Sequence, residues 1–592
     1  MSIAIEDIVD VRDYLHIRGL NCPALEALNP TEQSYRALLL QPAGPIIANE
    51  TRIGPYDLSH ADAQATKFLE RAANEGHHLV VTPEYYLPVA TLLKCVSGSA
   101  FPSPDAIWVL GCESMTPSQV CDFKEKAHAT GKCDVFFEED AAAAVQGTYY
   151  DPVAYCFVAK DNQGNERRVV ILQFKTISSK DDYYFENKHL RVGKQIYRFT
   201  GQDGLLSLAT IICSDAFSLN DNKAVLQRLT HSATLLHVQL NPKPRHPDYR
   251  KYRVDTFARN HHTSNCDIVC LNWAENISQH SAEGDAGAAW NNENGSAWYI
   301  PDDRCSSRDV EVDLNERRGL YYSKHVRHRH VLNFHYGAAA FALTVPKLAH
   351  YGLHLHDNPL GPVVDRRYTW SDDAKDWVED TTCPDTGLTK LFTCDAGVIE
   401  AFATLKDVES RLQIERAIAL SCGITTGKEN WFGAHELAAC RIGDDELLRR
   451  VTVRLERDKS IEESRYQQVQ SVAMLRDILA KATPAMLPKQ ISDLAGGDVK
   501  ILWTLESPHT NVMKDGVQPA LVAFLGLQPS PDRIKGVSLA AYELLRREGK
   551  KERSHRLAVC YLTPAGTKFA PIPQLTDITH GGGSATSIDE AD

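Results

Sequence analysis

Three reactive side chains stand far apart in the sequence, and each directly follows a short apolar run: Glu84, Lys175 and Cys213. These runs are rich in Val, Ile and Leu, a composition that predicts buried β-strands. Ligands of α/β proteins bind at the carboxyl ends of parallel strands, so we expect the three side chains to meet at one edge. A carboxylate, an ammonium and a thiol are together the groups that nucleophilic acyl transfer requires.

Each of these groups has a separate task in that chemistry. A thiol attacks as the thiolate, and the pKa of a free cysteine is about 8.5, so Cys213 needs a base at neutral pH. Glu84 can accept the thiol proton and later return it to a leaving amine. Lys175 favours the thiolate and stabilises the oxyanion, for which the backbone N–H of Ser214 is a second candidate donor.

The order of these residues and their contexts, Pro83-Glu84 and Ile212-Cys213-Ser214-Asp215, resemble the nitrilase or carbon–nitrogen hydrolase superfamily. The resemblance covers about residues 35–345. It implies an α-β-β-α sandwich, subunits that pair through such sandwiches, and cleavage of a non-peptide C–N bond through a cysteine thioester.

Two further site residues follow from the resemblance. Glu186 is the candidate for the supporting glutamate of the superfamily, although its charged surroundings are equally typical of a solvated loop. Asp215 either caps the turn after the cysteine or contacts the substrate. The segment 147–151 stands where the superfamily often has a Tyr-Asn turn that opens a pair of strands.

The composition of the 592-residue chain is that of a globular protein, with 43% hydrophobic and 24% charged residues. The net charge of −13 argues against a general affinity for nucleic acid or anionic membranes. No apolar run reaches transmembrane length and the first residues do not resemble a signal peptide, so we expect a cytoplasmic protein. The 15 cysteines, an odd number without a small-scaffold spacing, favour a reducing compartment.

Neither a cofactor nor a metal ion is predicted. The chain has no glycine-rich phosphate-binding or dinucleotide-binding motif. The cysteines lack the close pairing of zinc ligands. The histidines of 325–335 alternate with arginine and apolar residues, a pattern that favours a solvated basic segment over a metal site.

The pattern of strands and helices predicts the domain organisation. Between residues 35 and 345 strand-like and helix-like segments alternate, which favours largely parallel sheets covered by helices. We expect an N-terminal leader (1–34), a nitrilase-like domain (35–355), a linker rich in Pro, Asp and Gly (356–395), a C-terminal α/β or α-rich domain (396–580) and a flexible acidic tail (581–592).

The sequence therefore predicts an amidohydrolase that acts on a small-molecule amide or nitrile, and the resemblance implies a homodimer or a larger oligomer. An amide is favoured because Ser214 and Asp215 replace the Trp-Glu pair that follows the cysteine of true nitrilases. Two alternatives stay open. The fold could serve as a signalling or assembly module with a protein partner on the C-terminal domain, as in relatives from bacterial antiphage defence, or the acyl group could pass to an amine.

Overall fold

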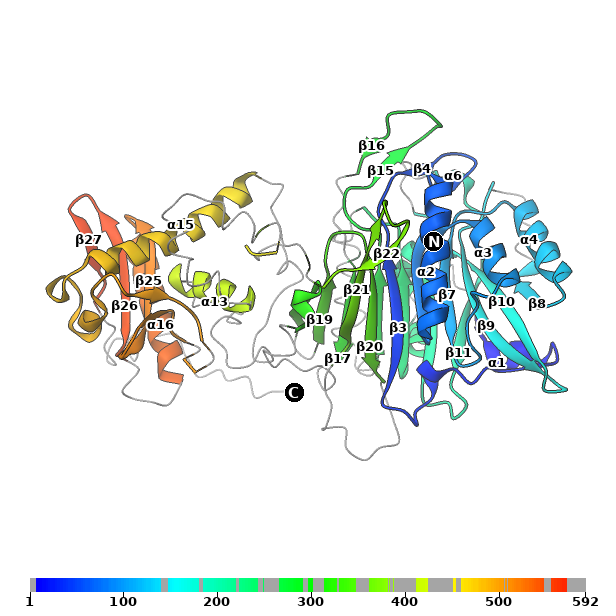
Figure 1. Ribbon diagram of the computed structural model, residues 1–592, viewed down its shortest axis with the longest axis horizontal. Helices are drawn as coiled ribbons and strands as arrows, with labels where there is room; N and C mark the ends of the chain where they lie inside the picture. The colour runs from blue at the N-terminus through cyan, green and yellow to red at the C-terminus, as the bar shows by residue number, and fades with distance from the viewer. Residues whose placement is uncertain are drawn as a thin grey trace. The chain divides into compact units, whose positions relative to one another are not determined.

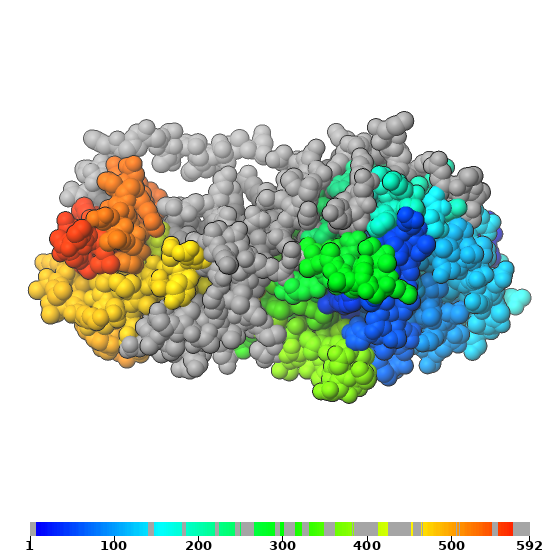
Figure 2. Space-filling view, turned by 90° about the horizontal axis from the view of Figure 1, so that it is seen from above, coloured from blue at the N-terminus to red at the C-terminus, as the bar shows by residue number. Residues whose placement is uncertain are grey.

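The computed structural model describes residues 7–139, 147–179, 185–219, 223–242, 249, 266–290, 296–301, 314–326, 329–347, 361–381, 383, 387, 411–423, 451–453, 459–504, 506–507, 509–547 and 555–571. The chain forms two compact units, and the boundary between them falls after Cys383. The first unit is coloured blue to green and the second yellow to red in Figures 1 and 2.

Two large sheets form the centre of the first unit. The eight-stranded sheet has the order β1 (Asp7–Asp10), β11 (Gln195–Thr200), β12 (Ser207–Ile212), β13 (Ala233–Val238), β14 (Cys266–Leu271), β17 (Ala297–Pro301), β19 (Arg329–Phe334) and β18 (Leu320–Val326). Its central strands β12, β13 and β14 are parallel, whereas β11 and β17 run antiparallel to their neighbours β12 and β14.

The second sheet has ten strands. Nine of them follow the order β22 (Asp376–Glu379), β21 (Val363–Ser371), β20 (Ala339–Pro346), β3 (Ser34–Gln41), β6 (Leu79–Leu87), β7 (Ile107–Cys112), β9 (Pro152–Asp161), β10 (Glu166–Phe174) and β8 (Cys133–Phe137), and β2 (Leu20–Asn21) pairs with β9. Strands β3, β6 and β7 are parallel. Strands β7, β9 and β10 alternate in direction, as does the β22–β21–β20–β3 edge. The expectation of largely parallel sheets is therefore wrong, because several connections are hairpins.

Helices cover the outer face of each sheet. In Figure 1, α2 (Leu58–Glu75), α3 (Val89–Ser97) and α4 (Pro117–Ala129) lie on one side of the ten-stranded sheet. Phe68 of α2 and Phe123 of α4 share a buried apolar cluster with Leu110 of β7. On the eight-stranded sheet, α8 (Lys223–Thr230) contributes Leu226 and Leu229 to a second cluster with strand residues.

The inner faces of the two sheets pack against each other. The rings of Tyr155 (β9) and Phe199 (β11) have centroids 5.0 Å apart, and those of Phe334 (β19) and Phe341 (β20) lie 4.9 Å apart. The order of layers is therefore helix, sheet, sheet, helix. This mixed α/β arrangement fits the predicted nitrilase-like sandwich.

Two predicted boundaries differ from the structure. Within the expected leader 1–34, β1 pairs with β11, and Val11 and Leu15 of α1 (Val11–His16) are buried. These two apolar residues are surrounded by polar ones in the sequence, so the segment resembles a polar leader. Within the expected linker 356–395, β21 and β22 form an antiparallel pair at the edge of the ten-stranded sheet and bury Trp377. Residues 356–360, 382, 384–386 and 388–395 of that linker lie outside the described residues.

The second unit has a smaller sheet. Its strands are β23 (Lys500–Ile501), β24 (Val512–Lys514), β25 (Val517–Leu527), β26 (Leu557–Thr563) and β27 (Gly566–Phe569), accompanied by helices α13 (Arg411–Ser421), α15 (Lys459–Lys481) and α16 (Pro531–Arg547). Helix α16 joins the parallel strands β25 and β26, so this unit is of the α/β kind. The predicted acidic tail 581–592 lies outside the described residues. Among the described helices of the whole chain, none is long and apolar enough to span a bilayer.

Candidate functional site

The structure brings the three predicted reactive residues to one edge of the paired sheets. Lys175 directly follows β10 and Cys213 directly follows β12, as the sequence predicts. Glu84 instead lies inside β6, whose pairing with β7 is irregular between Thr82 and Leu87. The neighbouring strand has Gly111 at this point, where a Cβ would overlap the carbonyl of Pro83. Glycine therefore lets the irregular part of β6 approach β7 closely.

Lys175 forms the centre of a buried charged cluster. Its Nζ donates hydrogen bonds to Glu84 Oε1 at 2.7 Å and to Glu186 Oε1 and Oε2 at 2.7 and 3.0 Å. All three side chains are at most 3% exposed. Water cannot screen charges at this depth, so each ionic hydrogen bond fixes the position of the ammonium strongly.

Further hydrogen bonds hold both glutamates in place. Glu84 Oε2 accepts a hydrogen bond from the Leu240 backbone N–H, and the Glu84 carbonyl accepts one from Trp273 Nε1 at 2.8 Å. Glu186 Oε1 accepts a hydrogen bond from the Tyr85 hydroxyl at 2.8 Å, and Oε2 accepts one from the Ser179 backbone at 2.6 Å. Glu186 is therefore a buried member of the site rather than part of a solvated loop.

Three residues in or next to the site have a strained backbone. The φ angles are 39° at Cys213, 59° at Tyr85, which follows Glu84, and 58° at Phe185, which precedes Glu186. A positive φ is unfavourable for residues other than glycine and is often found where a side chain must be presented in a particular direction. Here the positive φ angles interrupt the regular backbone at or next to the residues that carry the thiol and the two carboxylates.

Cys213 begins a short 3₁₀ turn that ends at Asp215. Its Sγ lies 3.2 Å from the Tyr249 hydroxyl oxygen. Its carbonyl oxygen accepts a hydrogen bond from His237 Nε2 at 2.8 Å. The side-chain contact and the backbone contact together fix the direction of the thiol.

Asp215 fastens this turn to the segment after Lys175. Its Oδ1 accepts hydrogen bonds from the backbone and hydroxyl of Thr176, both at 2.8 Å, and from Ile177 N at 3.1 Å. Its Oδ2 accepts one from Ile212 N at 3.1 Å. The Ser214 hydroxyl donates to the Ile177 carbonyl at 2.6 Å. Of the two roles left open for Asp215, the capping role matches these contacts.

The electrostatics of the cluster place the protons. Burial would lower the pKa of Lys175, but the charges of Glu186 and Glu84 outweigh it and raise that pKa well above the ordinary value. Burial and then the charge of Glu84 raise the pKa of Cys213 well above its usual range, although Lys175 opposes the shift. Burial also raises the pKa of Glu84. The resting site therefore holds an ammonium and a thiol, beside a carboxylate of increased basicity.

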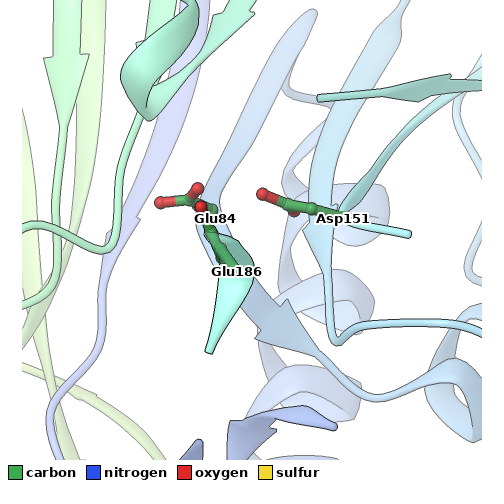
Figure 3. Close-up of side chains that lie close together, drawn as sticks. All are labelled: Glu84, Asp151 and Glu186. Atoms are coloured by element: carbon green, nitrogen blue, oxygen red, sulfur yellow. The ribbon is translucent and has the colours of Figure 1, made fainter. Parts of the chain in front are cut away.

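Two site residues were not predicted from the sequence. Asp151 is fully buried, with Oδ2 3.7 Å from Lys175 Nζ, and Figure 3 shows its carboxyl group pointing toward Glu84. The sequence of the segment 147–151 does not indicate the direction of this side chain. Tyr249 follows a polar, proline-containing stretch, 241–248, which gives no sign that its hydroxyl contacts the thiol.

Three buried carboxyl groups surround the ammonium of Lys175. Oxygen atoms of Glu84, Asp151 and Glu186 all lie within 4.8 Å of one another. Lys175 Nζ is already hydrogen-bonded to two of them, so the ammonium supplies the positive charge that this cluster needs.

A small pocket with a volume of about 50 Å³ lies beside Cys213. Lys175, Glu186 and Cys213 provide its reactive side, and the other lining residues are Ile46, Ala48, Ile53, Tyr85, Ser179, Leu240, Asn241, Pro242, Tyr249 and Trp290. The reactive groups therefore face a mostly apolar chamber.

No family model matches the chain, and no curated protein matches it. Solved structures that resemble it include a glutamine-dependent NAD+ synthetase from Acinetobacter baumannii, with 13% identity and a TM-score of 0.30 over 88% of this chain and 84% of that chain. A nitrilase-superfamily amidase from Nesterenkonia has 13% identity and a TM-score of 0.24, covering 46% and 84%. A carbon–nitrogen hydrolase from Helicobacter pylori has 10% identity and a TM-score of 0.26, covering 45% and 82%. The chemistry of the site therefore rests on its side-chain geometry.

Proposed function

We propose that the chain is a thiol-dependent amidohydrolase that cleaves a small, non-peptide amide. One observation carries the proposal: the Lys175 ammonium is hydrogen-bonded to Glu84 and Glu186, and lines the same pocket as Cys213. A thiol and a fixed cation at one pocket, with a buried carboxylate hydrogen-bonded to that cation, are suited to acyl transfer.

The first half of the reaction forms a thioester. Glu84 accepts the proton of Cys213, and Sγ attacks the amide carbon to give a tetrahedral oxyanion. Lys175 and the Ser214 backbone N–H stabilise that oxyanion. The intermediate collapses when Glu84 returns the proton to the departing nitrogen, so ammonia or an amine leaves and the acyl group stays on Cys213.

The second half releases the acid. Glu84 takes a proton from a water molecule, the hydroxide attacks the thioester carbon, and the same two donors stabilise the second oxyanion. The proton then returns to Sγ as the carboxylic acid departs. Glu186 holds Lys175 in place throughout. Removal of one oxyanion donor typically lowers kcat about 10²- to 10³-fold, which sets the scale for Lys175.

The proposal favours an amide over a nitrile because Ser214 and Asp215 follow the cysteine where true nitrilases have Trp-Glu. The same groups would also pass the acyl group to an amine. Adding hydroxylamine distinguishes the two fates, because an acceptor site for amines yields the hydroxamate in preference to the acid.

The proposal is tested by assaying ammonia release from a panel of small neutral amides, together with the intact mass of the protein. We expect turnover of at least one amide, an acyl adduct on Cys213, and loss of both in Cys213→Ala. A Cys213→Ala protein that releases ammonia at the wild-type rate would contradict the proposal. Cys156→Ala is a matched control, because Cys156 is buried in β9 outside the pocket.

A further inference from the structure

We propose that Asp151 is a neutral carboxylic acid in the resting enzyme, which holds its proton against Glu84 and so positions the base without adding charge to the cluster. The inference rests on the proposed function and adds a residue to its machinery. Asp151 is a positioning residue, because it acts through Glu84 and Lys175 and does not line the pocket.

The backbone and the side chain of Asp151 have separate roles. The Asp151 carbonyl accepts a hydrogen bond from the Lys175 backbone N–H at 3.0 Å, which aligns the ends of two strands. The side chain is fully buried, and neither of its oxygens accepts a hydrogen bond from the described residues. A substitution of the side chain therefore leaves the backbone link intact.

An ionised Asp151 would lack what a buried carboxylate needs. Buried carboxylates are normally stabilised by several donors or by a close ion pair. The ammonium of Lys175 is 3.7 Å away and already donates to Glu84 and Glu186. A third ionised carboxyl would leave the four-residue cluster with two uncompensated negative charges.

A neutral Asp151 needs only one acceptor, and the carboxylate of Glu84 supplies it. Figure 3 shows the carboxyl group of Asp151 directed toward Glu84 and Glu186, and oxygen atoms of the three residues lie within 4.8 Å of one another. Burial, followed by the charge of Glu84, raises the pKa of Asp151 well above its ordinary value, and the hydrogen bond from Asp151 in turn lowers that of Glu84. The titratable groups that act on Asp151 from the surrounding elements are Glu84, Tyr85, Cys112, Tyr149, Lys175 and Glu186.

The proton of Asp151 affects the thiol through the charge of the cluster. When Asp151 ionises, a new negative charge appears beside Glu84 and Lys175, so Lys175 stabilises the Cys213 thiolate less. At alkaline pH, where Asp151 loses its proton, the rate of Cys213 alkylation should therefore rise less than it would with a neutral Asp151. Asparagine cannot ionise, so Asp151→Asn should remove that limit.

The test is the rate of Cys213 alkylation by iodoacetamide from pH 5 to 10 in the full chain, which requires no knowledge of the substrate. We expect Asp151→Asn to match the wild type within about twofold at low pH and to exceed it increasingly as the pH rises. Asp161→Asn is the matched control, because Asp161 ends the same strand β9 in an exposed turn, and it should follow the wild type throughout.

Two outcomes would overturn the inference. Profiles of wild type and Asp151→Asn that coincide at every pH would show that the proton has no effect. A folded Asp151→Asn protein in which the rate of Cys213 alkylation at low pH is at least tenfold below that of the wild type would show that the ionised form of Asp151 is needed. A failed proposed function looks different, because Cys213 would then react slowly in every variant at every pH.

An infrared measurement on the wild type keeps the inference testable if Asp151→Asn does not fold. We expect the carbonyl stretch of a protonated carboxyl at neutral pH, and its loss on the alkaline side with the same midpoint as the limit of Cys213 alkylation. Absence of the band at neutral pH, or a different midpoint, would overturn the inference.

Discussion

Lys175 Nζ lies 2.7 Å from Glu84 Oε1, although the two residues are 91 positions apart and belong to different segments of the ten-stranded sheet. Glu186 binds the same ammonium from the start of helix α6 (Glu186–His189). The ammonium thus links three segments of the chain and faces the pocket of Cys213. Its removal should affect both stability and reactivity.

Lys175→Met should lower the free energy of unfolding by about 3–5 kcal/mol, because two buried carboxylates lose their partner. The deficit should be smaller at pH 5 than at pH 8, since protons can neutralise the carboxylates of the variant. Urea unfolding at both pH values measures this. Lys94→Met is the control, because Lys94 pairs with Asp62 at an exposed site, and it should cost less than about 1 kcal/mol. Equal costs for the two variants would contradict the central position of Lys175.

Asp215 should make the stability fall as the pH rises from 4 to 7. Burial raises the pKa of Asp215 to about 6, despite the hydrogen bonds from Thr176 and Ile212 that oppose the shift. A carboxyl whose pKa is raised by folding stabilises the protein fully below its unfolded pKa, and this contribution is lost as the pH passes the folded value.

The measurement for Asp215 is the free energy of unfolding of the wild type minus that of Asp215→Asn between pH 4 and 7. The contributions of other titrating groups cancel in this difference. The wild type should lose about 2 kcal/mol relative to the variant between pH 4 and 7. A difference that stays constant with pH would show that the pKa of Asp215 is not raised.

Strain at Cys213 predicts an unusual order of stability. Glycine adopts a φ of 39° without cost, so Cys213→Gly should be at least as stable as Cys213→Ala. At Cys156, in the regular strand β9, the glycine variant should be less stable than the alanine variant by about 0.5–1 kcal/mol. Thermal unfolding of the four proteins tests this, and the same order at both positions would refute the strain at Cys213.

Tyr249→Phe should slow the alkylation of Cys213 about tenfold at neutral pH. The variant loses the hydroxyl 3.2 Å from Sγ, and a hydrogen bond to a charged group contributes about 1.5–3 kcal/mol. Tyr197→Phe is the control, because Tyr197 is buried at β11 and bonds Gln195 instead. An unchanged rate in Tyr249→Phe would show that the hydroxyl does not stabilise the thiolate.

The sequence predicts the parts of this site that depend on strand ends. Lys175 and Cys213 follow regular strands, so apolar runs and the residue types that follow them are enough to predict where they lie. The irregular course of β6 at Glu84 depends on contact with Gly111 in another strand, and no local pattern contains that information.

The missed residues show the same limit. Asp151 belongs to the site because its backbone pairs with Lys175, and this pairing sets the direction of its side chain. Tyr249 opens a segment for which the sequence predicts a helix to His262, and this prediction does not indicate that its hydroxyl contacts Cys213. Residues 250–262 of that segment lie outside the described residues. The sequence does not predict the strands β21 and β22 for a related reason. The Pro- and Gly-rich residues before them suggest a linker, whereas pairing with the sheet determines their structure.

The most direct test of the central claim is the rate at which limiting iodoacetamide modifies Cys213 at neutral pH, compared between the wild type and Glu84→Gln by mass spectrometry. Cys121 is exposed and provides an internal reference in both proteins. We expect Cys213 to react faster than Cys121 in the wild type, and at least tenfold more slowly in Glu84→Gln. A Cys213 that reacts no faster than Cys121, or equally fast in both proteins, would contradict a thiol activated by Glu84.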